Sequence, residues 1–298
     1  MSVLTEIEPG SVQETVASHH CPSCGNGHIN ILYRREFQGK CWSLAQCTAC
    51  SLHFTDPIPT AEDIAGFYKG DYHAEFRSPG VAERILGPKF KRYVSWITRF
   101  VSSGRSLDIG CSTGLLPKML QDAGFVSAGI ELNAANASWG NQHYGVPIRS
   151  GGLEDDLAPE PLYDLVIMGD VLEHTPNPFT FLCRVNRVLK TNGFVFVSFP
   201  DITSIESSYY RLLSKLLRRP WLWITCHIPG HTWEFTPHTA KNLFARAGFE
   251  VVGFRRASLR QELEGRLKVL SFPTRITDIW PSRFGSQMEF MLRKVSVS

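Results

Sequence analysis

The sequence lacks any long apolar run and any strong excess of charge. Its longest uninterrupted apolar stretches, such as "FVFV" at 194–197, are far shorter than the roughly 20 residues that span a bilayer. The first residues, "MSVLTEIEPG", lack the basic start and apolar stretch of a secretion leader. A formal net charge of +3 on 298 residues is too small to predict a nucleic-acid or acidic-membrane surface over the whole molecule. We therefore expect a globular, cytoplasmic protein that recognises its partners locally.

Disulfide frameworks are also not indicated, because half of the eight cysteines stand alone and the rest form two close pairs. The pairs are Cys21-x2-Cys24 and Cys47-x2-Cys50, with a spacing between them that is typical of zinc ribbons. Four thiolates complete the tetrahedron around Zn²⁺, so the metal would be structural. We predict a flexible tail at 1–18 and a zinc ribbon at 19–58. An oxidised or metal-free version of the ribbon is the alternative.

A helical connector is predicted at 59–102. Thr60 and Asp63 have the spacing of a capping box, which predicts a helix running to about Tyr68. The stretch 81–101 has apolar residues at helical spacing, interrupted at Gly87-Pro88.

Strands and helices alternate from residue 103 onward, which indicates βαβ units around a parallel sheet. The fold class predicted is α/β, with a Rossmann-like, seven-stranded and mostly parallel sheet flanked by helices, in a domain at 103–298. The predicted strands lie at 105–110, 127–132, 146–151, 163–170, 194–200, after the helix that begins near 236, and at 287–297; the predicted helices between them lie at 115–124, 133–145 and 176–193.

The segment "SLDIGCSTG" at 106–114 predicts a ligand site between the first of these strands and its helix. Backbone N–H groups and a helix N-terminus meet there at the carboxyl edge of the sheet. A dinucleotide fingerprint beginning at Gly110 would need glycine at 112 and 115, where the sequence has Ser112 and Leu115. The spacing therefore disfavours NAD.

The same turn resembles the first motif, D/E-x-G-x-G-x-G, of class I S-adenosylmethionine-dependent methyltransferases, with Ser112 in place of the middle glycine. The resemblance implies S-adenosylmethionine as cofactor. The carboxylate that ends the next strand, Glu131, would accept the ribose hydroxyls. The other residues implied are Asp108, Gly110, Cys111, Ser112 and Gly114 around the methionyl part, Leu132 beside the ribose site, and Gly152, Leu153 and Glu154 along the adenine.

A second motif, "YDLVIMGDVLEH" at 163–174, resembles the fourth strand of one subgroup of these enzymes. It places Asp170 beside both cofactor and acceptor and makes His174 the natural base. A cap on the following helix is an equal alternative for His174. Glu173 either orients this imidazole or faces solvent. His231, in "HTWEF", is a second candidate base.

The full resemblance covers about 20–255 and is closest in kind to bacterial methyltransferases that tailor sugars, polysaccharides or natural products. It implies a small-molecule or glycan-linked acceptor, methylated on O, N or C. One alternative is RNA or protein methylation with the ribbon as docking module, although the ribbon has few cations and nucleic acid is disfavoured. Another is an inactive, cofactor-binding scaffold.

An insert at about 203–235 is predicted to form a lid over the carboxyl edge. Its segment 207–228 combines arginines and lysine with tyrosines and tryptophans. Acceptor recognition by the lid and a plain lid helix with a solvated basic face both fit this pattern. Contact with a membrane surface is a third interpretation, which we do not favour.

Overall fold

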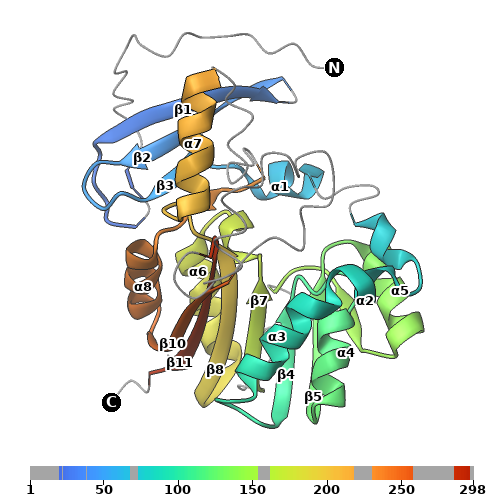
Figure 1. The fold of residues 1–298 in the computed structure, drawn as a ribbon. Helices are drawn as coiled ribbons and strands as arrows, with labels where there is room; N and C mark the ends of the chain where they lie inside the picture. Colours follow the sequence, from blue (N-terminus) through green and yellow to red (C-terminus); the bar gives the residue numbers. More distant parts are fainter. Residues whose placement is uncertain are drawn as a thin grey trace.

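The computed structural model describes residues 20–21, 23–37, 39–67, 73–153, 162–217, 230–257 and 285–295 (Figure 1). The predicted tail at 1–18 lies outside these residues. The described elements are β1 (Ile29–Phe37), β2 (Lys40–Cys47), β3 (His53–Asp56), α1 (Ala61–Phe67), η1 (Ala74–Arg77), α2 (Val81–Ile85), α3 (Gly87–Ile97), β4 (Gly104–Ile109), α4 (Leu115–Asp122), β5 (Phe125–Glu131), α5 (Ala134–Tyr144), β6 (Ile148–Ser150), β7 (Tyr163–Gly169), η3 (Leu172–His174), α6 (Pro178–Val188), β8 (Leu189–Pro200), α7 (Ile205–Leu217), β9 (Trp233–Glu234), α8 (Pro237–Arg246), β10 (Phe249–Ala257) and β11 (Gln287–Lys294).

A seven-stranded sheet forms the centre of the fold, in the order β10-β11-β8-β7-β4-β5-β6. Strands β8, β7, β4, β5 and β6 pair in parallel, whereas β11 runs antiparallel to both of its neighbours, β8 and β10. The predicted α/β, mostly parallel, seven-stranded sheet is therefore confirmed. The chain reverses its strand order at β4, so the carboxyl ends of β4 and β7 lie side by side.

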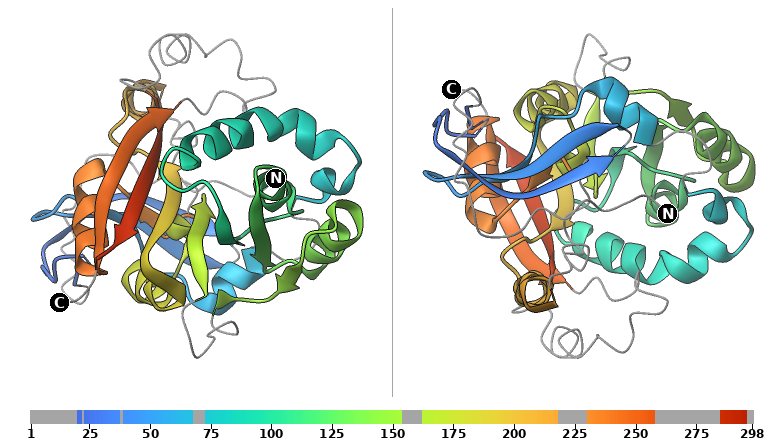
Figure 2. Two further views of the ribbon diagram at one scale, coloured as in Figure 1. Left: turned by 90° about the horizontal axis from the view of Figure 1, so that it is seen from below. Right: turned by 90° about the horizontal axis from the view of Figure 1, so that it is seen from above.

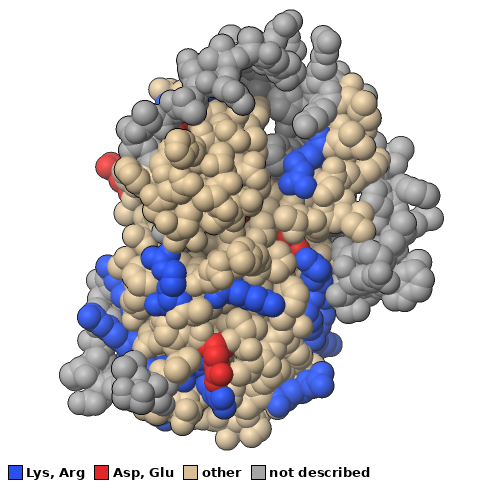
Figure 3. Space-filling view, turned by 90° about the vertical axis from the view of Figure 1, so that its left-hand side faces the viewer, with Lys and Arg blue, Asp and Glu red and all other residues tan. Residues whose placement is uncertain are grey.

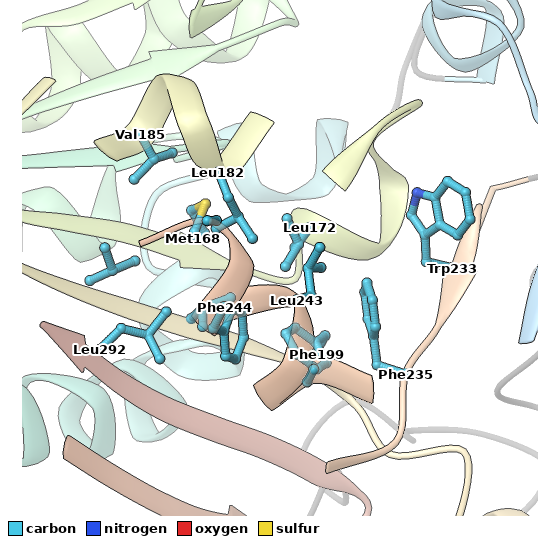
Figure 4. Close-up of a cluster of buried hydrophobic side chains, with 14 of the residues drawn as sticks. Met168, Leu172, Leu182, Val185, Phe199, Trp233, Phe235, Leu243, Phe244 and Leu292 are labelled. Carbon is cyan, nitrogen blue, oxygen red and sulfur yellow. The ribbon is translucent and has the colours of Figure 1, made fainter. Parts of the chain in front are cut away.

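Helices cover both faces of this sheet, which explains why β7 is apolar at successive positions (Figure 2). Leu165 and Ile167 pack with residues of α3 and α4 on one face. Val166 and Met168 pack with residues of α6 and α8 on the other. The core beneath α8 is aromatic: Phe199 lies 4.9 Å from Phe235 between ring centroids, and Figure 4 shows both beside Phe244.

The N-terminal strands form a second, four-stranded sheet in the order β1-β2-β3-β9. All of its pairings are antiparallel. Its last strand, β9, comes from beyond residue 230, so a segment remote in sequence completes the ribbon. The ribbon is thereby joined to the main domain by backbone pairing between Phe54 and Trp233.

Local signals in the connector are confirmed. Thr60 and Asp63 exchange the two hydrogen bonds of a capping box at the start of α1. The predicted break at Gly87-Pro88 separates α2 from α3, with Pro88 in the first turn of α3.

One boundary differs from the prediction. The helix expected over 176–193 ends at Val188, and β8 begins at Leu189. Leu189 pairs with Tyr163 of β7, so tertiary pairing extends the strand through residues whose local pattern is helical.

Among the residues described, no helix combines the length and hydropathy needed to cross a membrane.

The contact between α5 and the glycine-rich turn depends on Gly140. A Cβ at this position would overlap the Thr113 carbonyl oxygen and lie 2.5 Å from Cδ1 of Ile148. The missing side chain therefore lets the helix pack directly against the backbone of the turn.

Gly140→Ala should lower the free energy of unfolding by about 1–2 kcal/mol, because overpacking outweighs the better helix propensity of alanine. Gly66→Ala in α1 is the matched control, since a Cβ there meets no atom within 4 Å. Urea denaturation of both variants tests this, and equal stability of the two would contradict the packing argument.

Candidate active site at the carboxyl edge of the sheet

The turn between β4 and α4 has its backbone fixed by neighbouring side chains. Gly110 and Gly114 have positive φ of 72° and 84°, and Ser112 adopts φ 50°. A Cβ at Gly110 would lie 2.7 Å from Cγ2 of Val171, and one at Gly114 would lie 2.5 Å from Ile148 Cδ1. The turn therefore needs glycine at both ends, and it lies against the residues that follow β7.

Glu131 links the end of β5 to this turn. Its Oε2 accepts a hydrogen bond from the Ser112 N–H and its Oε1 accepts one from the Asn133 N–H, each at 2.8 Å. Burial raises the pKa of the Glu131 carboxyl, while these backbone donors oppose the rise. The carboxylate is thus held rigidly at the mouth of the turn.

A second carboxylate, Asp108, is buried nearby with an exposed fraction of only 3%. Burial, and then the negative charge of Glu131, raise the pKa of its carboxyl well above the usual range. The Ser112 hydroxyl in the same turn is buried with no hydrogen-bond partner among the described residues. This set of groups suits a ligand that brings positive charge and hydroxyl groups, and it opposes a pyrophosphate.

The other residues predicted to hold a cofactor lie in several environments. Cys111 is buried in a small cluster with Ala137 and Ile148, so its side chain is core. The side chain of Leu153 lies in the main hydrophobic cluster, and Leu132 is 57% exposed. The Gly152 carbonyl accepts a hydrogen bond from Arg149 Nη2 at 2.9 Å. Glu154 lies outside the described residues.

Asp170 lies directly after β7 in a left-handed conformation, with φ 57°. Its carboxylate accepts hydrogen bonds from Lys89 Nζ at 2.6 Å and from the side-chain amide of Gln287. Lys89 and Gln287 are both buried, and the Oε1 atom of Gln287 has no hydrogen-bond partner within the described ranges of the chain. Sequence analysis missed both residues, because nothing local marks a lysine in α3 or a glutamine in β11 as neighbours of Asp170.

His174 and His231 are brought together, with ring centroids 4.7 Å apart in an edge-on arrangement. His174 Nδ1 lies 2.7 Å from the Gly230 carbonyl oxygen, and His231 Nδ1 lies 3.0 Å from Oε1 of Glu234. Glu173 is buried, which rules out the solvent-facing alternative for it. Its Oε1 lies 3.9 Å from His174 Nε2. The two candidate bases of the sequence analysis therefore belong to one cluster.

Backbone contacts hold this cluster from two sides. The Thr232 N–H donates to the Glu173 carbonyl at 2.8 Å, and the Trp233 indole donates to the Thr175 carbonyl at 2.6 Å. From the ribbon, the Thr55 N–H donates to the Thr232 carbonyl at 2.9 Å and its hydroxyl donates to the His231 carbonyl at 2.6 Å. Trp233 is buried in the core, as Figure 4 shows at the end of the aromatic cluster. The ribbon is thus part of the frame that positions His231.

The four paired cysteines converge as predicted for a metal site. Their Sγ atoms lie within 4.8 Å of one another, at 3.4 Å for Cys21–Cys50 and 3.6 Å for Cys24–Cys47. Thiolates about 2.3 Å from a tetrahedral zinc are roughly 3.8 Å apart, whereas disulfide sulfurs are about 2.0 Å apart. The geometry fits zinc, and zinc binding stays a prediction.

A family model described as "Methyltransferase domain" matches residues 81–253, which include the glycine-rich turn, Glu131 and the histidine cluster. The chain belongs to this methyltransferase family. Residues 20–80, with the ribbon, lie outside the match. The expected resemblance to class I S-adenosylmethionine-dependent methyltransferases is confirmed by this match together with the fold.

Curated relatives match the central part of the chain. A ubiquinone biosynthesis O-methyltransferase of Glaesserella parasuis is 27% identical over 124 residues, which are 38% of this chain and 52% of the relative. Another of that name, from Bradyrhizobium diazoefficiens, is 32% identical over 99 residues, covering 32% of this chain and 39% of the relative. The chain thus spans about half, or less, of the length of the curated relatives it matches.

Solved structures share the fold. Magnesium protoporphyrin IX methyltransferase from Synechocystis, solved with bound S-adenosylhomocysteine, has a TM-score of 0.54 at 14% identity, covering 79% of this chain and all (100%) of that one. An S-adenosylmethionine-dependent methyltransferase from Archaeoglobus fulgidus has a TM-score of 0.52 at 18% identity, covering 75% of this chain and 100% of that one. At these identities the likeness concerns the fold.

S-adenosylmethionine fits the groups around the glycine-rich turn of this methyltransferase. It carries a sulfonium and an ammonium, which the buried Asp108 and the half-buried Glu131 would attract, and ribose hydroxyls, which Glu131 and the Ser112 hydroxyl could bind. When bound, it supplies an activated methyl group. The residues of this turn would hold and orient it.

Glu131→Ala should weaken S-adenosylhomocysteine binding by roughly 10- to 150-fold, which corresponds to loss of about 1.5–3 kcal/mol from charge-assisted hydrogen bonds. Calorimetric titration measures this, with the exposed residue Glu62 as the control in Glu62→Ala. Unchanged affinity in Glu131→Ala would remove Glu131 from the site.

The buried carboxyl of Glu173 should make the free energy of unfolding depend on pH. Burial, then the charges of Asp170 and Glu234, raise its pKa well above the usual range, and Lys89 opposes this rise. The folded chain therefore retains a proton that the unfolded chain releases above about pH 4.3. The contribution of this group to stability is complete below that pH and is lost as the pH rises toward the folded pKa.

Relative to Glu173→Gln, the wild-type chain should lose unfolding free energy by up to about 1.4 kcal/mol per pH unit as the pH rises from about 4.3 toward the raised folded pKa. Urea denaturation without added divalent cations measures the difference. The exposed Glu75 provides the control variant Glu75→Gln, for which the difference should be flat. A flat difference for Glu173→Gln as well would show that this carboxyl ionises normally.

Proposed function

We propose that the protein transfers a methyl group from S-adenosylmethionine to a small-molecule acceptor that carries an ionisable X–H group. The observation that carries this proposal is the position of the histidine cluster relative to the glycine-rich turn. Val171, whose Cγ2 would meet a Cβ at Gly110, is separated from Glu173 by a single residue. The acceptor chemistry would therefore occur beside the donor site.

Methyl transfer requires alignment and the removal of one proton. The acceptor atom forms a bond to the methyl carbon as the S–CH₃ bond breaks, the sulfonium becomes a neutral thioether, and the X–H proton leaves. A carbonyl oxygen only accepts hydrogen bonds, so Nδ1 of neutral His174 carries the proton and Nε2 carries the lone pair. That lone pair is the group we assign to proton removal, with His231 beside it.

The acceptor class is supported by the relatives, which are named for ubiquinone biosynthesis, and by the buried character of the cluster. A glycan-linked acceptor is the finer alternative that follows from the sequence resemblance. Asp170, held by Lys89 and Gln287, would present a fixed carboxylate to either kind of acceptor.

Docking of RNA through the ribbon is the competing hypothesis. On the face drawn in Figure 3 the described residues of the upper part are mostly tan, with one blue group on the right, and most of the lysines and arginines are dispersed over the lower part. The ribbon contacts that we find instead tie Thr55 to His231. We therefore propose a supporting role for the ribbon, and we do not favour nucleic acid as a partner. We also do not favour membrane contact through 207–228. Part of this segment, 218–228, lies outside the described residues.

The proposal is tested by release of S-adenosylhomocysteine from the full chain with phenols, catechols, sugar nucleotides and amines as acceptors. His174→Ala should keep cofactor affinity while turnover falls by roughly 10²- to 10⁴-fold, the usual range for loss of assisted proton transfer. His238→Ala, an exposed histidine on α8, is the control and should retain turnover.

Loss of cofactor affinity in His174→Ala would assign His174 a structural role. A chain that binds S-adenosylmethionine but methylates none of these acceptors would favour the scaffold hypothesis over the enzyme.

A further inference from the structure

Glu173 is a buried carboxylate with no hydrogen-bond donor among the described residues. Only 1% of its surface is exposed, and neither carboxylate oxygen has a hydrogen-bond partner in the part of the chain that the structure describes. Another deeply buried carboxylate, Glu289, is neutralised, because it accepts hydrogen bonds from Arg92 and Arg255. An unsatisfied buried carboxylate is costly unless a cation or a donor from outside the chain meets it.

The two neighbouring histidines are oriented as metal ligands usually are. His174 Nδ1 faces the Gly230 carbonyl at 2.7 Å and His231 Nδ1 faces the Glu234 carboxylate at 3.0 Å. Both acceptors favour the tautomer with the proton on Nδ1, which puts the lone pair on Nε2. Histidines that bind metals almost always donate their other N–H to a carboxylate or a carbonyl in this way.

The distances suit one ion. One ligand atom each from Glu173, His174 and His231 lie within 4.8 Å of one another, and Glu173 Oε1 is 3.9 Å from His174 Nε2. Two ligands about 2.0–2.1 Å from a tetrahedral ion are roughly 3.3 Å apart, so modest side-chain rotation closes the set. Among the described residues, this group and the four cysteines are the two that meet such a geometry.

We propose that Glu173, His174 and His231 bind a divalent cation of the zinc type, at a site separate from the four cysteines of the ribbon. Glu234 is a positioning residue that orients His231. Two imidazoles and one carboxylate leave a coordination position open, as in catalytic rather than structural zinc sites. The side chain of His174 is 18% exposed, so the open position is reachable from outside the core.

The consequence for the reaction rests on the proposed function. A cation at this site would bind an acceptor hydroxyl and lower its pKa, so that its proton leaves to solvent before the oxygen attacks the methyl carbon. The O–CH₃ bond then forms as the S–CH₃ bond breaks, giving a methyl ether and S-adenosylhomocysteine. With the cation bound, His174 and His231 would act as ligands, and the proton removal assigned above to His174 Nε2 would apply only to the metal-free site. The acceptor class would be a hydroxyl compound.

The test is equilibrium zinc binding by the full chain, measured by mass spectrometry of the metal after dialysis, without acceptor or cofactor. The wild-type chain should hold about two zinc ions, one at the cysteines and one at the new site. Glu173→Gln, which keeps the shape and removes the charge, should hold about one. His238→Ala, outside both sites, should hold as many as the wild type.

Glu234→Gln tests whether Glu234 orients His231 for metal binding. Loss of such an outer carboxylate should weaken the second zinc by about 10- to 100-fold while leaving the first unchanged. Equal zinc content and equal affinity in the wild type, Glu173→Gln and Glu234→Gln would overturn the proposal.

Nitrogen-15 NMR of the histidine side chains in the wild-type chain covers the case in which a variant does not fold. Zinc added beyond the first equivalent should shift Nε2 of His174 and His231, and no shift of either would overturn the site. Zinc binding without methyl transfer would contradict the proposed function alone. Methyl transfer by a chain that lacks the second zinc would contradict the metal site alone.

Discussion

The arrangement of the acceptor side of the site depends on a short backbone pairing between β3 of the ribbon and β9. Phe54 pairs with Trp233, and Thr55 is bonded through both its N–H and its hydroxyl to the segment 231–232. On the other side, the Trp233 indole is fixed by the Thr175 carbonyl. The backbone of His231 is therefore held between the ribbon and the segment that follows β7, and its ring lies beside that of His174. A ribbon that lost its fold would release this strand, so a zinc ion at the four cysteines, if bound as predicted, would support a site that it does not touch.

Carboxyl groups that are buried or half-buried at the carboxyl edge are the second constraint. Asp108 and Glu131 lie at the glycine-rich turn, and Glu173 and Glu234 lie at the histidine cluster. Burial opposes ionisation at Asp108, Glu131 and Glu173, so all three have raised pKa values. Such a collection destabilises the isolated chain, and positive charge from outside relieves it. The two ligands that we propose for this edge, the sulfonium of the methyl donor and a divalent cation, would both supply such positive charge.

The main sheet, the glycine-rich turn and the cysteine pairs could be predicted from the sequence, because short local patterns determine them. The glycine spacing at 110–114, the carboxylate ending the next strand and the paired cysteines are short patterns with a direct physical cause. Alternation of strands and helices was enough to predict the sheet. The predicted start of a strand at 194 was wrong, because pairing of Leu189 with Tyr163 extends β8 back to Leu189.

The contacts that complete the site could not be predicted, because they join residues far apart in the chain. Lys89 reaches Asp170 across 81 positions, and Gln287 reaches it across 117. The burial of Glu173 and the pairing of His231 with Glu234 arise only when β9 is placed beside η3. A single glutamate after a strand gives no signal of such an environment. The histidines were identified as candidate bases, and Glu173 as a residue that could orient His174, whereas the meeting of all three side chains was not predicted.

The most direct test of the account is calorimetric titration of the full, zinc-replete chain with S-adenosylmethionine, S-adenosylhomocysteine and NAD⁺ in parallel. The buried Asp108 and the half-buried Glu131, beside a turn with this glycine spacing, predict binding of the first two ligands and none of NAD⁺. Binding of NAD⁺, or of none of the three, would contradict the assignment of this edge to a methyl donor.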